Sequence, residues 1–181
     1  CVLTHGRLAP MSVLNLFTAH VHWNVIVTVM QKLHQKKFET LLAGGCVRDA
    51  LLGITPHDFD IASSATPEDV ARIFPNVLTV GRAFGVSIIP MNGHQVEVAT
   101  FRKDGEYLDG RHPSTVTFSD AKEDALRRDF TVNALFYDFF QDKILDFVDG
   151  LSDLKLKIVR TVGKAEDRFR EDKLRMLRAV R

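Results

Sequence analysis

The chain has 181 residues, with a hydrophobic fraction of 45%, a charged fraction of 26% and a formal net charge of +1. This length suits one ordinary domain, or one domain and part of another, and the composition is typical of a globular protein. The near-zero net charge excludes a strong overall basic field, so any nucleic-acid binding must come from local patches. Two cysteines, Cys1 and Cys46, are too few for a disulfide framework or a cysteine zinc site, and they favour a reducing compartment.

A stretch near the amino terminus, residues 8–31, contains no Asp, Glu, Lys or Arg. Its length suggests a membrane span or a targeting sequence. Histidine, asparagine and hydroxyl side chains dilute its hydrophobicity, however, and favour a terminal extension that leads into a packing helix. We therefore expect no membrane association. The chain lacks an initial Met and stops within a helical pattern at Arg181, so we expect it to be a fragment.

Apolar runs and turn signals predict the secondary structure along the chain. In order, the predicted elements are a helix at about 20–35, a strand at 38–43, a helix at 46–52, a strand at 58–63, a helix after Thr66, strands at 86–91 and 95–101, a long loop at 102–120, a helix after Asp120, strands near 134–138, 143–147 and 157–161, and a helical stretch from about 164 to the end.

Three local signals support this order. Thr66 followed by Pro67 predicts a capped helix start, and Asn92-Gly93 predicts a tight hairpin turn. Asp120 begins a capping-box pattern for the helix that follows it. The alternation of strands and helices predicts an α/β fold with a mixed sheet flanked by helices, followed by the start of an all-α region.

Asp58 and Asp60 lie two positions apart in the predicted strand at 58–63. Side chains alternate across a strand, so both carboxylates are expected on one face, with Phe59 on the other. Two such carboxylates repel each other unless a cation lies between them, and oxygen ligands suit Mg²⁺. Glu97, between two valines on another predicted strand, either joins these acids as a third carboxylate or faces solvent. A lone Asp-x-Asp is also common in turns and on surfaces.

Gly44 and Gly45 lie between a predicted strand and a predicted helix. Glycine lets backbone N–H groups approach a phosphate, and the helix start adds its dipole. Arg48, one turn into this helix, is placed to reach a triphosphate oxygen, and Asp49 is expected to orient Arg48 rather than to bind metal. The alternative interpretation is an ordinary tight turn with a solvent-facing arginine.

Taken together, these motifs resemble a known family. The stretch "GGCVRDALLG…DFDIA" resembles the opening signature of class II tRNA nucleotidyltransferases (CCA-adding enzymes) and bacterial poly(A) polymerases, which belong to the polymerase-β-like nucleotidyltransferase superfamily. Three later segments resemble further motifs of that family in the same order: "RRDFTVNALFYD" at 127–138, "DFVDGLSDLKLKIVRTVG" at 146–163 and "REDKLRMLRAVR" at 170–181. The resemblance runs from about residue 38 to 181.

This resemblance implies that Asp58 and Asp60 are metal ligands and that Glu97 is the accompanying acid. It also implies two Mg²⁺ ions, of which one activates the attacking hydroxyl and the other steadies the leaving pyrophosphate. Further residues are then expected to contact the nucleotide: Gly44, Gly45 and Arg48 at the triphosphate, Arg127 and Arg128 at sugar and phosphates, Asp172 and Arg175 at the base edge of CTP or ATP, and Arg178 and Arg181 on the basic side of the last helix.

Three more residues are expected to support these contacts. Asp129 and Asn133 would hold the second motif together, and Glu171 would orient the base-reading pair Asp172 and Arg175. Residues three apart are neighbours on a helix, and a carboxylate with a guanidinium matches the amino group and ring acceptors of C and A but not of U or G. The alternative is an ordinary solvated helix face with paired charges.

The segment 102–120 matches the position of a flexible loop that, in this family, helps to switch specificity from C to A. Arg102, Asp109 and Arg111 are its candidate functional residues. A surface loop without a chemical role is the alternative.

We therefore expect an amino-terminal extension and packing helix at 1–37, a catalytic head at 38–160 and the beginning of a helical neck at 161–181. The predicted reaction is template-independent addition of CMP and AMP from CTP and ATP to the 3′ end of tRNA, in full or only in part. Poly(A) synthesis on RNA 3′ ends and a non-catalytic RNA- or nucleotide-binding module are the alternatives. The expected location is the cytoplasm or an organelle matrix.

Overall fold

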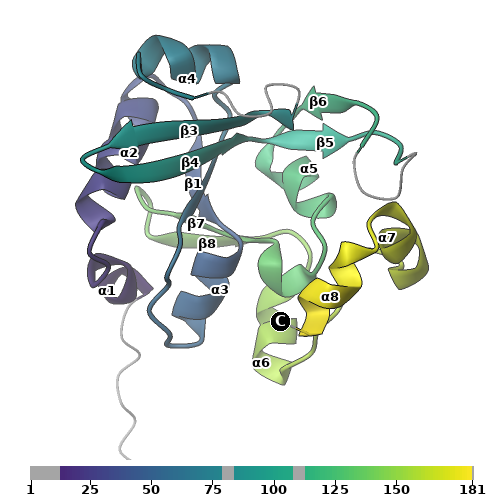
Figure 1. The fold of residues 1–181 in the computed structure, drawn as a ribbon. Coiled ribbons are helices and arrows are strands. Elements are labelled where there is room, and N and C mark those ends of the chain that lie inside the picture. The colour runs from purple at the N-terminus through teal and green to yellow at the C-terminus, as the bar shows by residue number, and fades with distance from the viewer. Residues whose placement is uncertain (1–12, 79–83, 108–112, 181) are drawn as a thin grey trace, which may run out of the picture.

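The computed structural model describes residues 13–78, 84–107 and 113–180. Its centre is a six-stranded mixed sheet with the strand order β3-β4-β2-β1-β7-β8 (Figure 1). Within this sheet β2 and β4 run parallel, and the other neighbouring pairs are antiparallel. The strands are β1 (Thr40–Ala43), β2 (Asp60–Ser63), β3 (Val86–Met91), β4 (His94–Thr100), β7 (Leu135–Asp138) and β8 (Lys143–Asp146).

Two short strands, β5 (Arg102–Asp104) and β6 (Val116–Phe118), form a separate antiparallel hairpin. The helices are α1 (Val13–Thr18), α2 (Trp23–Gln35), α3 (Gly45–Leu51), α4 (Pro67–Ile73), α5 (Ala121–Leu126), the 3₁₀ turn η2 (Thr131–Asn133), α6 (Gly150–Leu156), α7 (Ala165–Glu171) and α8 (Leu174–Val180).

Helices cover both faces of the sheet, so its central strand is buried on both sides (Figure 1). Leu41 and Leu42 are neighbours in β1, yet they belong to different hydrophobic clusters because side chains alternate across a strand. The cluster of Leu42 contains Val29 and Leu33 of α2, whereas the cluster of Leu41 contains Ala125 of α5. This explains the continuous apolar run of the strand.

The structure confirms the signals at Thr66 and Asn92-Gly93 and, at Asp120, the N-cap half of the predicted capping box. Thr66 and the residue at the third helical position form a complete capping box at the start of α4. Asn92 and Gly93 have φ values of 51° and 75°, as a tight β3–β4 turn requires. The Asp120 carboxylate accepts a hydrogen bond of 2.9 Å from the N–H of Glu123 and caps α5.

Other predictions were wrong. The segment 102–120 is not a featureless loop, because β5 pairs with β6 within it. Residues 157–161 form no strand apart from a single bridge between Thr161 and Phe130, and α6, which precedes them, was not predicted. Because the chain is extended at Asp172, the carboxy-terminal helical stretch consists of two helices rather than one.

The amino-terminal apolar stretch folds, where it is described, into α1 and α2, and their residues Phe17 and Ile26 lie in the core. Among residues 13–78, 84–107 and 113–180, no helix is long and apolar enough to cross a membrane.

Candidate active site

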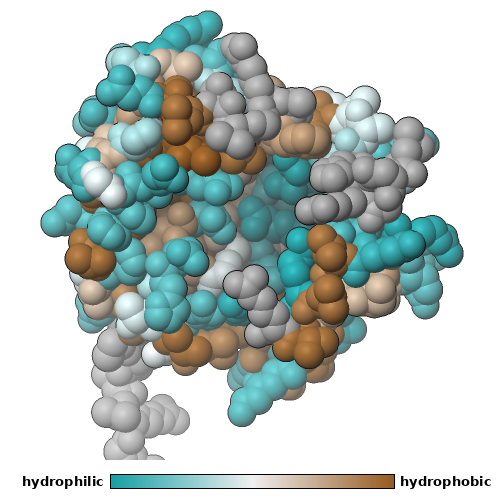
Figure 2. All heavy atoms as spheres, in the orientation of Figure 1, coloured by the Kyte–Doolittle hydropathy of each residue, from teal (hydrophilic) through white to brown (hydrophobic). Residues whose placement is uncertain are grey.

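A cavity of about 920 Å³ lies between the sheet, the β5–β6 hairpin and the α7–α8 junction. Its wall includes charged side chains from segments far apart in the sequence, and Figure 2 shows a mainly hydrophilic hollow on this face. Apart from Glu97 and Arg181, the cavity is lined by every residue that the sequence nominates for metal or nucleotide binding: Gly44, Gly45, Arg48, Asp58, Asp60, Arg127, Arg128, Asp172, Arg175 and Arg178.

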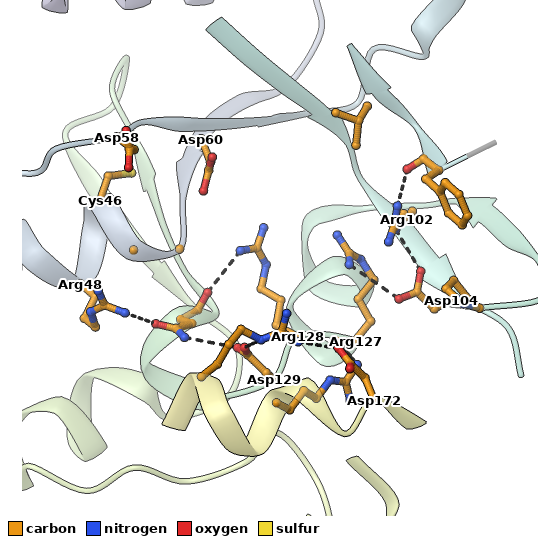
Figure 3. A pocket seen from close by; sticks show the side chains of 18 of the residues that line it. Cys46, Arg48, Asp58, Asp60, Arg102, Asp104, Arg127, Arg128, Asp129 and Asp172 are labelled. Atoms are coloured by element: carbon orange, nitrogen blue, oxygen red, sulfur yellow. Dashed lines mark hydrogen bonds and ion pairs between the residues drawn. The ribbon is translucent and has the colours of Figure 1, made fainter. Parts of the chain in front are cut away.

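Asp58 and Asp60 lie on the same side of this cavity (Figure 3). The prediction that both belong to one strand was wrong, because β2 begins at Asp60 and Asp58 lies just before it. The chain is nevertheless extended enough for the expected alternation: Phe59 is 8% exposed and packs in the core, while both aspartates are exposed. Burial of the Phe59 ring therefore directs the two carboxylates into the cavity.

Glu97 lies beside Asp60, because the two residues are partners in the parallel pairing of β4 with β2. Together they line a smaller cavity of about 200 Å³. Desolvation raises the pKa of the Asp60 carboxyl, with Arg128 acting in the opposite direction and Asp58 in the same one. Desolvation and the charge of Asp60 likewise raise the pKa of Glu97. Within the described parts of the chain, no three His, Cys, Asp or Glu side chains are grouped closely enough to hold a metal ion by themselves.

Cys46 lies near Asp60, but its thiol is unreactive. Its Sγ donates to the carbonyl of Ala43 at 3.3 Å, and the residue is 3% exposed. Burial raises the pKa of this thiol to about 12, so it remains protonated near neutral pH and is neither a nucleophile nor a metal ligand there.

The turn before α3 depends on Gly44, which has a φ of 74° and a ψ of −128°, a conformation that favours glycine. A Cβ at this position would lie 3.1 Å from Arg128 Nη1. The turn thus keeps the backbone close to an arginine of the opposite wall. Arg48, the fourth residue of α3, donates to Asp49 at 2.9 Å and to the side-chain oxygen of Asn133 at 2.5 Å.

A buried carboxylate, Asp124, holds Arg127 and Arg128 and was not predicted from the sequence. It is 1% exposed, and its two oxygens accept hydrogen bonds of 2.8 Å from Arg127 Nε and 3.1 Å from Arg128 Nε. Arg128 also donates to the carbonyl of Asn133, and its guanidinium lies 4.8 Å from the centroid of the Phe136 ring. The available signal was the spacing of Asp124, three and four residues before the arginine pair.

Asp129 connects the second motif to the last helix. Its Oδ1 accepts from the N–H of Phe130 and the side-chain amide of Asn133, and its Oδ2 pairs with Arg178 Nε at 3.0 Å. Asn133 in turn accepts from Arg48. Polar contacts therefore join three functional segments: the helix after the glycine turn, the second motif and the last helix.

Asp172 and Arg175 line the cavity, but not from one continuous helix. Asp172 ends α7 in an extended conformation, and its carboxylate accepts from the N–H of Leu174 at 2.9 Å and pairs with Arg178 at 2.7 Å. Arg175, 4% exposed, pairs with Glu171 at 2.6 Å. The side-chain cap at Asp172 explains the helix break.

Three nominated residues, Asp109, Arg111 and Arg181, lie outside the described residues. Arg102 of the same segment lines the cavity and pairs with Asp104 at 2.9 Å.

Comparisons with known proteins agree with this geometry. Residues 40–160 match the family described as the poly(A) polymerase head domain. The CCA-adding enzyme of Oceanobacillus iheyensis is 49% identical over 154 residues, which cover 84% of this chain and 38% of that protein. The CCA-adding enzyme of Geobacillus stearothermophilus is 47% identical over the same length, again covering 84% of this chain and 38% of the relative.

Solved structures give the same picture. The Bacillus stearothermophilus CCA-adding enzyme in complex with CTP superposes with a TM-score of 0.78 at 41% identity, covering 89% of this chain and 38% of that one. The Thermotoga maritima CCA-adding enzyme complexed with tRNA superposes with a TM-score of 0.68 at 26% identity, covering 94% and 40%.

The chain therefore belongs to the poly(A) polymerase head domain family, which confirms the resemblance and the fold class inferred from the motifs. It spans about two fifths of the length of the curated relatives that it matches.

Proposed function

We propose that this chain is the nucleotidyltransferase head of an enzyme that adds CMP and AMP from CTP and ATP to the 3′ end of tRNA. The observation that carries the proposal is that Asp58 and Asp60 open into the same cavity as Asp172 and Arg175. One cavity thus offers acids for metal chemistry and a donor–acceptor pair for a base. The names of the relatives support the same reaction.

The acids fit Mg²⁺. Asp58 and Asp60 supply carboxylate oxygens on one side of the cavity, and desolvation beside a second acid raises the pKa of Asp60, a cost that a bound cation relieves. When bound, Mg²⁺ would supply charge stabilisation at the reacting phosphate and would activate the RNA hydroxyl. Substrate phosphates and water would complete its ligand set, since the described residues offer no closed cage. Glu97, beside Asp60, would add to the negative field.

The triphosphate would lie between the Gly44–Gly45 turn and the second motif. Arg48, Arg127 and Arg128 each keep part of a guanidinium facing the cavity while a carboxylate fixes the rest. Catalysis by such a site would consist of positioning and charge stabilisation, with little covalent chemistry by the protein.

The base would be read by Asp172 and Arg175. A carboxylate accepts from the amino group that C and A both carry, and a guanidinium donates to the adjacent ring nitrogen. Against U or G, one of these buried charged groups would lose its partner, which would disfavour binding. In the same proposal, residues 1–37 form the packing extension, 38–160 the head and 161–181 the start of the neck, and the enzyme works in the cytoplasm or an organelle matrix.

Substitution of the two aspartates tests the proposal. The intact protein is incubated with tRNA that lacks its 3′ CCA and with single nucleotides, as wild type, Asp58→Ala and Asp60→Ala. Each alanine variant should lose at least about 10³-fold of its addition rate while keeping its melting temperature, because an essential metal ligand is gone. Asp167→Ala, which removes an exposed carboxylate that does not line the cavity, is the matched control.

Full activity in either aspartate variant would refute the metal assignment. Addition of repeated AMP without CMP would instead favour poly(A) synthesis, the second candidate, which the name of the matched family supports. A folded wild-type protein that adds no nucleotide would favour the non-catalytic module.

A further inference from the structure

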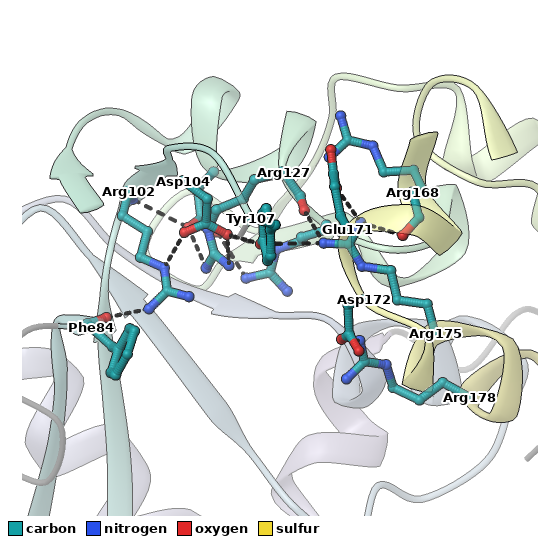
Figure 4. A network of polar contacts seen from close by, with 12 residues as sticks. Phe84, Arg102, Asp104, Tyr107, Arg127, Arg168, Glu171, Asp172, Arg175 and Arg178 are labelled. Carbon is teal, nitrogen blue, oxygen red and sulfur yellow. Dashed lines mark hydrogen bonds and ion pairs between the residues drawn. The ribbon is translucent and has the colours of Figure 1, made fainter. Parts of the chain in front are cut away.

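Tyr107 lies at the end of the β5 side of the hairpin and lines the main cavity, although no motif in the sequence marks it. Its hydroxyl donates to Asp104 Oδ2 at 2.7 Å. Arg175 Nη2 donates to the same hydroxyl at 3.4 Å, and the Arg175 guanidinium lies 5.6 Å from the centroid of the Tyr107 ring (Figure 4). Tyr107 therefore connects the hairpin to the base-reading arginine.

The direction of these hydrogen bonds is fixed by chemistry. An arginine can only donate and an ionised carboxylate can only accept, so the hydroxyl of Tyr107 must accept from Arg175 and donate to Asp104. The side chain of Asp104 is 5% exposed and is shared with Arg102 Nε at 2.9 Å and Arg127 Nη1 at 3.7 Å. Burial and the hydrogen bond to Asp104 raise the pKa of Tyr107 to about 12, so the hydroxyl keeps its proton near neutral pH.

The donors of Arg175 can be accounted for one by one. Nη1 donates to Glu171 Oε2 at 2.6 Å and to the carbonyl of Arg168 at 3.3 Å. Nη2 donates to the hydroxyl of Tyr107 at 3.4 Å and to the carbonyl of Arg127 at 3.5 Å. A guanidinium has five donors. The fifth, Nε, is buried and has no hydrogen-bond partner among the described residues.

The two ends of the guanidinium are thus held differently. Glu171, from the helix that Arg175 follows, holds Nη1 by a charged contact. Tyr107 and a backbone carbonyl hold Nη2 from the head. The guanidinium can rotate about the bonds of its own side chain. Contacts at both Nη1 and Nη2 limit this rotation, whereas a contact at one of them alone does not. The hydroxyl of Tyr107 is the side-chain contact that supplies the second hold.

We propose that Tyr107 is a positioning residue that fixes the orientation of the Arg175 guanidinium, whose Nε is the one donor that no described residue accepts from, and so contributes to discrimination between CTP and UTP. This inference rests on the proposed function. It assigns to the hydroxyl of Tyr107 an effect on selectivity that exceeds its effect on the addition rate.

The test compares Tyr107→Phe with the wild type in the intact protein. This substitution keeps the ring and removes only the hydroxyl. The probe is tRNA lacking its 3′ CCA, and the readout is kcat/KM for CTP and for UTP, measured separately at a temperature at which both proteins are folded. The CTP-to-UTP ratio should fall by about tenfold, the effect of losing one hydrogen bond to a charged group, with kcat for CTP nearly unchanged.

Tyr137→Phe is the matched control. Tyr137 also donates its hydroxyl to an aspartate, Asp142 Oδ1, at 2.7 Å, but it does not line the cavity. It should lose stability without losing selectivity. Tyr107→Leu, which also removes the ring beneath Arg175, should reduce the ratio further.

An unchanged CTP-to-UTP ratio in Tyr107→Phe would overturn the inference. This includes the case in which kcat/KM falls by the same factor for both nucleotides, because a merely structural role of the hydroxyl would lower both equally. A wild-type protein that adds neither nucleotide would contradict the proposed function itself. A selective wild type with an equally selective Tyr107→Phe variant would contradict only the role of Tyr107.

Discussion

The acids on the two sides of the cavity differ in whether they form ion pairs with arginines. On the side of the sheet, Asp58, Asp60 and Glu97 form no ion pair with any residue that the structure describes. On the opposite side, each acid pairs with at least one arginine: Asp104 with Arg102, Asp124 with Arg127 and Arg128, Asp129 with Arg178, and Asp172 with Arg178. We call the side whose acids are neutralised by arginines the scaffold side, and the side whose acids have no such partner among the described residues the acidic side.

This difference separates paired acids, which hold the site together and of which Asp172 is also proposed to read the base, from unpaired acids. An ion pair that is already satisfied in the protein gains little from a substrate, whereas a desolvated acid beside another acid gains from any cation that binds. Substitutions on the scaffold side should therefore cost stability. Substitutions on the acidic side should cost activity and leave stability nearly unchanged.

The largest effect is expected for Asp124→Asn. Removing one partner of a buried ion pair leaves uncompensated charge, and here two arginines lose their carboxylate, so the free energy of unfolding should fall by about 3 kcal/mol. Asp60→Asn should change it by less than about 0.5 kcal/mol, as for an exposed site. Urea unfolding of both variants measures the difference. Equal losses would show that the two sides do not differ.

Asp124 also shows what sequence reasoning can reach. The glycine turn, the paired aspartates and the arginine pair were predicted because each residue type has its chemistry in a short local pattern. The capped starts of α4 and α5 and the β3–β4 turn were predicted for the same reason. Asp124 was missed because its importance depends on its burial and on a hydrogen bond from the backbone N–H of Arg102, which is distant in sequence.

The errors have a common physical cause. Pairing of β5 with β6 joins two short segments whose own sequence has no strand period, so it depends on tertiary contacts. The break between α7 and α8 depends on the side chain of Asp172 turning back to cap the next helix. Tyr107 was missed because nothing near it in the sequence places it beside Arg175, 68 residues away.

A smaller effect is expected where the two sides approach each other, at Gly44. Gly44→Ala forces a side chain into a positive φ and brings its Cβ to 3.1 Å from Arg128 Nη1, so it should cost about 2 kcal/mol. Gly53, with a φ of 78° and no atom within 4 Å of the position of a Cβ, is the matched control. Gly53→Ala should cost about 1 kcal/mol, the price of the backbone alone.

The difference between the two glycine variants in urea unfolding combines the contact with Arg128 and the cost of placing a side chain at the ψ of −128° of Gly44. Equal losses in the free energy of unfolding would mean that Arg128 moves away from the new side chain at no cost. The ion pairs of Arg128 would then hold its side chain less firmly than their distances indicate.

Addition of Mg²⁺ sharpens the comparison on the acidic side. A ligand that binds only the folded state at about ten times its Kd raises the free energy of unfolding by about 1.4 kcal/mol. Mg²⁺ should therefore raise the melting temperature of the wild type, and the increase should be lost in Asp60→Asn but kept in Asp129→Asn. A similar increase in all three proteins would indicate nonspecific binding of the ion.

The smallest effect is on the pH dependence of stability. Since the pKa of Asp60 is raised from its ordinary value of 3.8, the folded protein binds more protons than the unfolded chain between that value and the raised one. Stability contributed by this group is therefore lost as the pH rises through that window, and the raised pKa of Glu97 acts in the same direction.

Asp60→Asn removes the contribution of Asp60 to this pH dependence. It also weakens the contribution of Glu97, because the charge of Asp60 is one of the causes of the raised pKa of Glu97. Relative to the wild type, the variant should gain a few tenths of a kcal/mol between about pH 4 and pH 7, a small amount because the Asp60 side chain, although partly desolvated, still faces the open cavity. Urea midpoints at both pH values measure it, with Asp167→Asn as the control. A relative loss in Asp60→Asn would mean that the Asp60 carboxylate is stabilised in the folded protein, as the acids of the scaffold side are.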